Sequence, residues 1–139
     1  MKRSDLDELI ERMFEVAEAA RRNAHVPNCH FPVGACLRGD GPALFAGANV
    51  ENPVPSQSIC AETAALGAMI VAGERRLTHV LIIGGRAEPQ FCPPCGGCRQ
   101  RLAQFADATT MVHLCRSDGK RQSTYLWEML PLRAEAPSA

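Results

Sequence analysis

The first part of the chain repeats its hydrophobic side chains at the period of an α-helix. The apolar residues that fall on one face, at about 3.6 residues per turn, are Leu6, Leu9, Ile10, Met13, Ala17 and Ala20. Ser4 precedes this stretch and belongs to a residue type that caps helix N-termini, while Pro27 follows it. The pattern predicts an amphipathic helix over residues 5–24 that covers a hydrophobic core.

Short apolar runs bounded by turn residues predict four β-strands. Residues 31–37 and 43–50 flank a turn rich in glycine and ending in proline, which predicts a hairpin. Residues 77–83 end at two glycines, and residues 109–114 precede a second turn sequence, Ser117-Asp-Gly-Lys120. Both of these runs are apolar enough to be buried on both faces of a sheet.

Three further segments are predicted to be helical. Residues 60–72 are rich in Ala, Leu and Met and contain no proline, and Gly73 stands where such a helix would stop. A second helix is expected over residues 96–106, directly after a cysteine-rich loop, and a last one over 125–130. The order helix, hairpin, helix, strand, helix, strand predicts an α/β domain with a mixed sheet.

Composition and charge narrow what this domain can do. With 139 residues, of which 46% are hydrophobic, the chain can bury a core without help from disulfides. The 15 basic and 15 acidic residues cancel, which disfavours nucleic acid or an anionic membrane as a partner. No signal peptide or membrane-spanning stretch is recognisable, so we expect a cytoplasmic protein with one domain over residues 1–132 and a frayed tail over 133–139.

The cysteines carry the first sign of chemistry. Three of the seven lie in Cys92-Pro-Pro-Cys95-Gly-Gly-Cys98, a clustering that favours metal binding or catalysis over a disulfide framework. Cys95 and Cys98 fall in the first turn of a predicted helix, where both sulfurs can reach one ion and the helix dipole favours thiolates. Three thiolates on Zn²⁺ leave a fourth tetrahedral position for water, as in catalytic sites.

Cys60-Ala-Glu62 offers the third thiolate together with an acid. Side chains two residues apart on a regular helix diverge by about 200°, so both can face one site only if Cys60 is the helix cap. Glu62 could then move protons between water and a substrate nitrogen, which is what the acid that is not a ligand does in zinc deaminases. Two alternatives remain: Glu62 as a fourth ligand, and a closed structural site that includes Cys92.

These motifs resemble the small, three-cysteine form of the cytidine deaminase family. Phe31-Pro-Val-Gly-Ala35 is similar to its first-strand motif, Gly47-Ala-Asn49-Val-Glu51-Asn52 to its nucleoside-binding segment, and Pro94-Cys95-Gly-Gly-Cys98-Arg99-Gln100 to its second zinc motif. The resemblance implies a three-layer α/β/α domain with a mixed five-stranded sheet. It also implies a homo-oligomer, with a tetramer favoured over a dimer.

The activity that the resemblance implies is the hydrolytic deamination of cytidine or deoxycytidine to uridine or deoxyuridine and ammonia, a step of pyrimidine salvage. Asn49 and Glu51 would hydrogen-bond the ribose, Phe31 would pack against the pyrimidine, and the Ala61 N–H would meet the base carbonyl. Without the zinc motifs, Phe31 would be a core residue and the polar pair a turn. The alternatives are a deaminase of a modified nucleoside or other aminated heterocycle, and a structural zinc module without turnover.

The chain departs from the family pattern at three places. Pro53-Val54-Pro55 replaces a segment that carries an aromatic ring, and Leu132-Arg133-Ala134 replaces a C-terminal phenylalanine. Thr63 replaces an arginine that neutralises a zinc-bound thiolate. We therefore expect helix dipoles or Arg99 to offset the thiolate charge, Arg101 to be a solvated charge, and the base pocket to be looser than in the family.

Overall fold

A mixed sheet of five strands forms the middle layer of the structure, a computed structural model that describes residues 1–86 and 88–130. The strand order is β2-β1-β3-β4-β5. Only β3 and β4 pair in parallel, and the other neighbouring strands are antiparallel. The strands are β1 (Val33–Arg38), β2 (Leu44–Ala48), β3 (His79–Gly84), β4 (Met111–Cys115) and β5 (Arg121–Tyr125).

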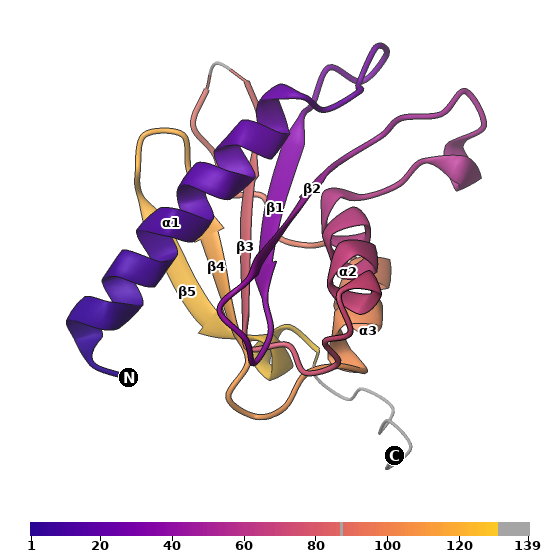
Figure 1. Cartoon of the computed structure of the whole chain (residues 1–139). Helices are drawn as coiled ribbons and strands as arrows, with labels where there is room; N and C mark the ends of the chain where they lie inside the picture. Colours follow the sequence, from indigo (N-terminus) through magenta and orange to yellow (C-terminus); the bar gives the residue numbers. More distant parts are fainter. Residues whose placement is uncertain (87, 131–139) are drawn as a thin grey trace.

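Helices cover both faces of this sheet. Helix α1 (Arg3–Arg22) crosses one face, while α2 (Ala61–Val71) and α3 (Gly96–Ala103) lie side by side on the other (Figure 1). Of two short 3₁₀-helices, η1 (Pro55–Gln57) lies between β2 and α2, and η2 (Leu126–Met129) directly follows β5. The expected three-layer α/β/α architecture is therefore confirmed.

Alternate side chains of the central strands supply two hydrophobic cores. Strand β3 is buried along its whole length, as its apolar sequence predicts. The core under α1 contains Leu9, Ile10, Met13, Ala17, Cys36, Leu81, Ile83 and Cys115. The core under α2 and α3 includes Ala35, Leu37, Ala65, Met69, Val80, Ile82, Leu102 and Val112. The sheet thus has no solvent-facing side in its centre.

Gly47 sets the position of α2 on the sheet. A Cβ atom at this residue would overlap the backbone of Ala61 and Ala65, so only glycine lets the helix approach β2 this closely. The far end of α2 stops as the sequence predicts, with Gly73 at a φ of 89° just beyond the last turn. This packing fixes where the residue that precedes α2, Cys60, lies relative to the sheet.

Several local predictions are wrong. Ser4 does not cap α1, because the helix begins earlier and its N-cap is Lys2, which makes no side-chain cap bond. The strand expected over 43–50 ends at Ala48, and the helix expected over 96–106 ends at Ala103. The segment expected to be a helix over 125–130 is only the short η2, and it follows strand β5.

Strand β5 was missed because its side chains are mostly exposed and polar, so no apolar alternation marks it. The expected tail over 133–139 and the changed residues Leu132 to Ala134 lie outside the described residues. In the part of the chain that the structure describes, no helix has the length and apolar character needed to cross a membrane.

Candidate metal centre

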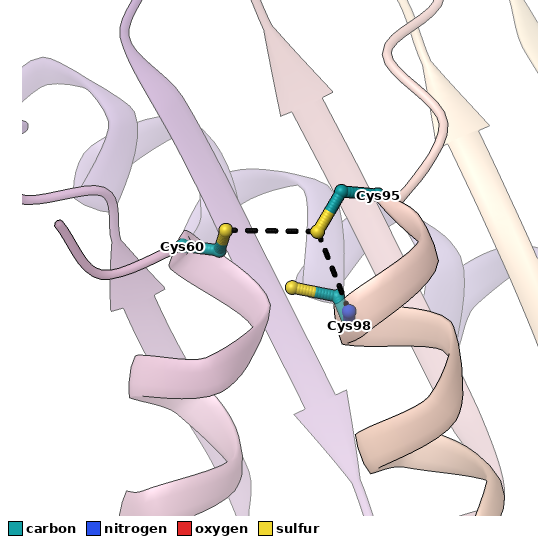
Figure 2. Close-up of side chains that lie close together, drawn as sticks. All are labelled: Cys60, Cys95 and Cys98. Atoms are coloured by element: carbon teal, nitrogen blue, oxygen red, sulfur yellow. Dashed lines mark hydrogen bonds between the residues drawn. The ribbon is translucent and has the colours of Figure 1, made fainter. Parts of the chain in front are cut away.

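The first turns of α2 and α3 bring three cysteines together. Cys60 is the N-cap of α2, with extended backbone angles (φ −74°, ψ 150°), as the spacing of Cys60 and Glu62 requires. Cys95 is the N-cap of α3, and its Sγ accepts a hydrogen bond of 3.3 Å from the Cys98 N–H. Figure 2 shows the three sulfur atoms facing the gap between the two helix starts.

The sulfur positions fit a tetrahedral metal ion. Cys60 Sγ lies 3.8 Å from Cys95 Sγ, and all three sulfurs lie within 4.8 Å of one another. At the usual Zn–S distance of about 2.3 Å, the corners of a tetrahedron are separated by about 3.8 Å. The donor set and its spacing therefore suit Zn²⁺, with one tetrahedral position left for another ligand.

Cys92 lies outside this sulfur cluster. A Cβ atom on Gly84 would come within 3.0 Å of the Cys92 Sγ and 3.3 Å of the Phe31 ring, so the cysteine packs beside strand β3 and this ring. Burial raises the pKa of the Cys92 thiol to about 11. Cys92 is thus not one of the three clustered sulfurs in this structure, although the charges of Glu62, Cys60 and Cys95 also raise the pKa of its thiol.

Burial at the cluster disfavours the ionised form of two of the three thiols. Burial raises the pKa of the Cys60 and Cys98 thiols. At Cys95 burial acts in the same direction, but the hydrogen bond from the Cys98 N–H helps to bring the pKa of this thiol below its usual value. A bound divalent ion reverses the cost of ionising buried thiols, because a coordinating thiol loses its proton.

Glu62 places a carboxyl group beside the three sulfur atoms. It is the second residue of α2 and is only 5% exposed, and burial raises the pKa of its carboxyl group. Its charge also raises the pKa of the Cys98 thiol, which places the carboxyl beside the cluster. A carboxyl whose pKa is raised holds its proton to a higher pH than an exposed one, which suits a group that has to both accept and donate a proton.

Two of the residues expected around the base lie on the same face of the sheet as this centre. Ala61 is fully buried as the first residue of α2, where a backbone N–H has no partner within the helix. Phe31 is partly buried against the core beneath α2 and α3. The structure thus brings Ala61 and Phe31 to the same side of the sheet as the three cysteines.

The polar pair expected to read the sugar makes backbone contacts. Asn49 Oδ1 accepts a hydrogen bond of 2.8 Å from the Val33 N–H, and Asn49 Nδ2 donates one of 3.0 Å to the Phe31 carbonyl. Glu51 accepts from the N–H groups of Asn28 (2.6 Å) and Cys29 (2.9 Å), and the Asn28 bond is the main cause of its lowered pKa. Both side chains therefore hold the segment that carries Phe31.

The two arginines of α3 make different contacts. Arg99 donates to the carbonyl groups of Pro94 (2.8 Å) and Met129 (3.1 Å), so neither of these bonds is directed to a thiolate. Arg101 is exposed, as expected of a solvated charge, and it also donates to the Thr63 hydroxyl at 3.4 Å. Thr63 Oγ1 in turn lies 3.6 Å from Cys98 Sγ. The only sequence signal for this contact is the three-residue spacing of Cys98 and Arg101.

Comparisons with known proteins agree with this geometry. Residues 7–114 match the model of the cytidine and deoxycytidylate deaminase zinc-binding region. The chain is 31% identical over 122 residues to a cytidine deaminase from Sporosarcina psychrophila, covering 88% of both chains. It is 35% identical over 124 residues to one from Halalkalibacterium halodurans, covering 88% of this chain and 92% of the relative.

Solved structures give the same result. The crystal structure of cytidine deaminase from Burkholderia pseudomallei superposes with a TM-score of 0.80 at 33% identity, covering 88% of this chain and 96% of that one. The structure of cytidine deaminase from Mycobacterium tuberculosis gives a TM-score of 0.77 at 27% identity, covering 91% and 97% of the two chains.

Proposed function

The chain belongs to the cytidine deaminase family, and from this we propose that it catalyses the zinc-dependent hydrolysis of cytidine and deoxycytidine to uridine and deoxyuridine with release of ammonia. Such a reaction serves pyrimidine salvage. The observation that carries the proposal is the cluster of three sulfurs with a buried carboxyl beside it. A structural zinc site would have a fourth protein ligand and no need of an acid.

The cofactor is Zn²⁺, because the matched family region binds zinc and the sulfur spacing suits this ion. We assign Cys60, Cys95 and Cys98 as its ligands. When bound, Zn²⁺ supplies a Lewis acid that lowers the pKa of a water molecule towards neutrality. The two helix N-termini at Cys60 and Cys95 add partial positive charge at the thiolates.

Glu62 is the proposed general acid and base. It takes a proton as the water oxygen bonds to C4 of the base, and delivers that proton to N3. It then transfers the second proton of the water to the amino group, and the C4–N bond breaks as ammonia leaves. The raised pKa that burial gives Glu62 supports this role, because the same group must accept and donate in one turnover.

The nucleoside is proposed to bind across α2 and the segment before β1. The Ala61 N–H would donate to the base carbonyl, and the Phe31 ring would pack against the base. Asn49 and Glu51 would bind the ribose hydroxyls with the hydrogen-bonding capacity that their backbone contacts leave over. A carboxylate has about four acceptor sites and an amide nitrogen has two hydrogens, so both residues can serve the loop and the sugar together.

We also propose a homo-oligomer, with a tetramer favoured. The connection between β2 and α2 extends away from the sheet (Figure 1) and exposes the apolar residues Val50, Val54 and Ile59, of which Val54 is 54% exposed. Apolar side chains grouped on one projecting loop suit burial against a second copy. We further propose that residues 1–132 form a single catalytic domain. We place the protein in the cytoplasm, because its seven free cysteines suit a reducing compartment.

A substrate panel tests the function. Purified, zinc-loaded protein is incubated with cytidine, deoxycytidine, cytosine, guanine and adenosine, and ammonia release is followed with the Glu62→Gln variant as the matched control. We expect turnover of cytidine and deoxycytidine that the variant lacks. Activity on cytosine or guanine alone would overturn the nucleoside assignment. Zinc binding with no turnover of any substrate would favour the structural module.

A further inference from the structure

The proposed zinc centre carries a net negative charge, which the partial positive charges of the two helix N-termini at Cys60 and Cys95 offset in part. Three thiolates and one Zn²⁺ sum to a net charge of −1, and Glu62 lies beside them in a buried position. Charge in a partly buried site must be compensated by nearby cations or hydrogen-bond donors. Arg99 follows a ligand directly in the sequence, but its donors are directed to the carbonyl groups of Pro94 and Met129.

A chain of two contacts connects a different cation to the cluster. Arg101 Nη1 donates to Thr63 Oγ1 at 3.4 Å, and Thr63 Oγ1 lies 3.6 Å from Cys98 Sγ. A hydroxyl has one hydrogen to donate, a guanidinium can only donate, and a thiolate can only accept. The direction of both bonds is therefore fixed: Arg101 donates to the hydroxyl of Thr63, and Thr63 donates to the sulfur of Cys98.

The positions of the three residues on helices α2 and α3 permit these two contacts. Arg101 follows Cys98 by three residues, so both side chains lie on one face of α3, and Thr63 lies in the first turn of α2. Gly97 leaves room for the guanidinium, because a Cβ atom there would lie 3.3 Å from Arg101 Nη1. The contact thus joins α2 to α3 at the level of the sulfur cluster.

We propose that Thr63 and Arg101 are positioning residues that act as one unit on the Cys98 thiolate: Arg101 supplies the charge, and the Thr63 hydroxyl transmits it to the sulfur. The proposal rests on the zinc site assigned above but not on the substrate. Its consequence is a metal held more tightly by Cys98. Substitution of a residue that hydrogen-bonds to a metal ligand typically lowers metal affinity by ~10–100-fold. Because Arg101 is exposed, we expect an effect near the lower end of this range.

The test measures zinc release rather than turnover. Zinc-loaded protein is mixed with a chromogenic chelator, and the rate of release is compared between wild type, Arg101→Ala, Thr63→Val and the double variant. We expect each single variant to release zinc about 10-fold faster than wild type. The double variant should release it no faster than either single variant, because both substitutions interrupt the same pair of contacts between Arg101, Thr63 and Cys98. Arg12→Ala, which removes the same charge from the exposed face of α1, is the matched control and should behave as wild type.

A spectroscopic signature separates this role from a general effect on folding. In the Co²⁺-substituted protein, the thiolate-to-cobalt absorption should shift in Arg101→Ala and Thr63→Val and return towards wild type in Arg101→Lys, which keeps the charge. Unchanged release rates and spectra, or fully additive losses in the double variant, would overturn the proposal. Failure to deaminate cytidine while these effects persist would count against the proposed function alone.

Discussion

The sulfur atoms of Cys60 and Cys95 lie 3.8 Å apart, although 35 residues separate the two cysteines in the chain. Each cysteine is the N-cap of a helix, and both helices pack on the same face of the sheet (Figure 1). Strand β1 pairs antiparallel with both β2 and β3, the strands that precede these two helices in the chain. Since ionised sulfurs at this distance repel one another, the fold and a bound cation must stabilise each other.

Removal of zinc should therefore lower the stability of the protein. A ligand present at 1,000 times its Kd stabilises the native state by about 4 kcal/mol, which corresponds to a Tm shift of roughly 10 °C for a domain of this size. Thermal unfolding before and after treatment with a chelator measures the shift, and added Zn²⁺ should restore the original Tm. An unchanged Tm in protein shown to be metal-free would mean that the cluster contributes nothing to folding.

Cys92 should be dispensable for metal binding. Cys92→Ser should retain one zinc per chain, whereas Cys95→Ser should lose it, because Cys92 packs beside Gly84 and Phe31 and is not one of the three clustered sulfurs. Metal content after dialysis distinguishes the two variants. Equal loss of zinc from both would support the closed four-cysteine site.

Glu62→Gln should keep zinc and fold but lose nearly all activity. Proton transfer by a positioned side chain contributes ~10²–10⁴-fold, and one carboxyl serves two transfers here, so the loss of kcat should reach or exceed that range. Metal analysis and steady-state kinetics on the same preparation give the answer. Loss of zinc from this variant would identify Glu62 as a ligand and contradict the proposed mechanism.

The buried histidines should make the protein sensitive to acid. His79 Nδ1 lies 3.1 Å from His113 Nε2, and His113 Nδ1 lies 2.7 Å from Ser123 Oγ. Burial lowers the pKa of both histidines, that of His113 to about 3, and the charges of Arg38 and Arg121 act in the same direction. Below the ordinary pKa of about 6.5, the unfolded chain then binds more protons than the folded one.

The contribution of neutral His113 to the free energy of unfolding is therefore fully present above about pH 6.5. It falls as the pH drops towards 3, by up to about 1.4 kcal/mol per pH unit for a single group. Urea unfolding between pH 7.5 and 5 measures this slope. His113→Gln should be less stable at neutral pH but show a shallower dependence, because its side chain does not titrate. Identical slopes in wild type and variant would show that His113 titrates with the same pKa in the folded and unfolded states.

The parts of the fold that rest on apolar periodicity could be predicted from the sequence, and the parts that rest on backbone pairing could not. The helix expected over 5–24 is α1 (Arg3–Arg22), and the strand expected over 77–83 is β3 (His79–Gly84). Strand β5 pairs with β4 through its backbone while its polar side chains face solvent, so its sequence carries no signal.

The same division applies to the candidate site. The clustering of Cys60, Cys95 and Cys98 could be predicted, because motif spacing places each cysteine at the start of a helix. The contact between Thr63 and Arg101 could not, because it crosses from α2 to α3 and depends on how the two helices pack. The carbonyl partners of Arg99 could not be predicted for the same reason, since they are set by the loop before α3 and by η2.

Recognition of the sugar gives the last prediction. Glu51→Ala should lower kcat/KM for cytidine sharply and leave any slow reaction with free cytosine almost unchanged. A site built to hydrogen-bond a hydroxyl can discriminate by ~10⁴-fold against a compound that lacks it, so the loss on cytidine should approach that factor. Steady-state kinetics on both substrates, with thermal unfolding of the same samples, measure the effect.

The backbone contacts of Glu51 require a control for this experiment. Glu51 also accepts hydrogen bonds from the N–H groups of Asn28 and Cys29, so its removal frees the segment that leads to Phe31. Glu51→Gln keeps one acceptor oxygen for that segment but replaces the other with an amide donor, and it should retain the fold. If cytidine and cytosine lose activity equally, Glu51 serves only to position Phe31. If cytidine loses nothing, the sugar is bound elsewhere, and a substrate without ribose becomes the better assignment.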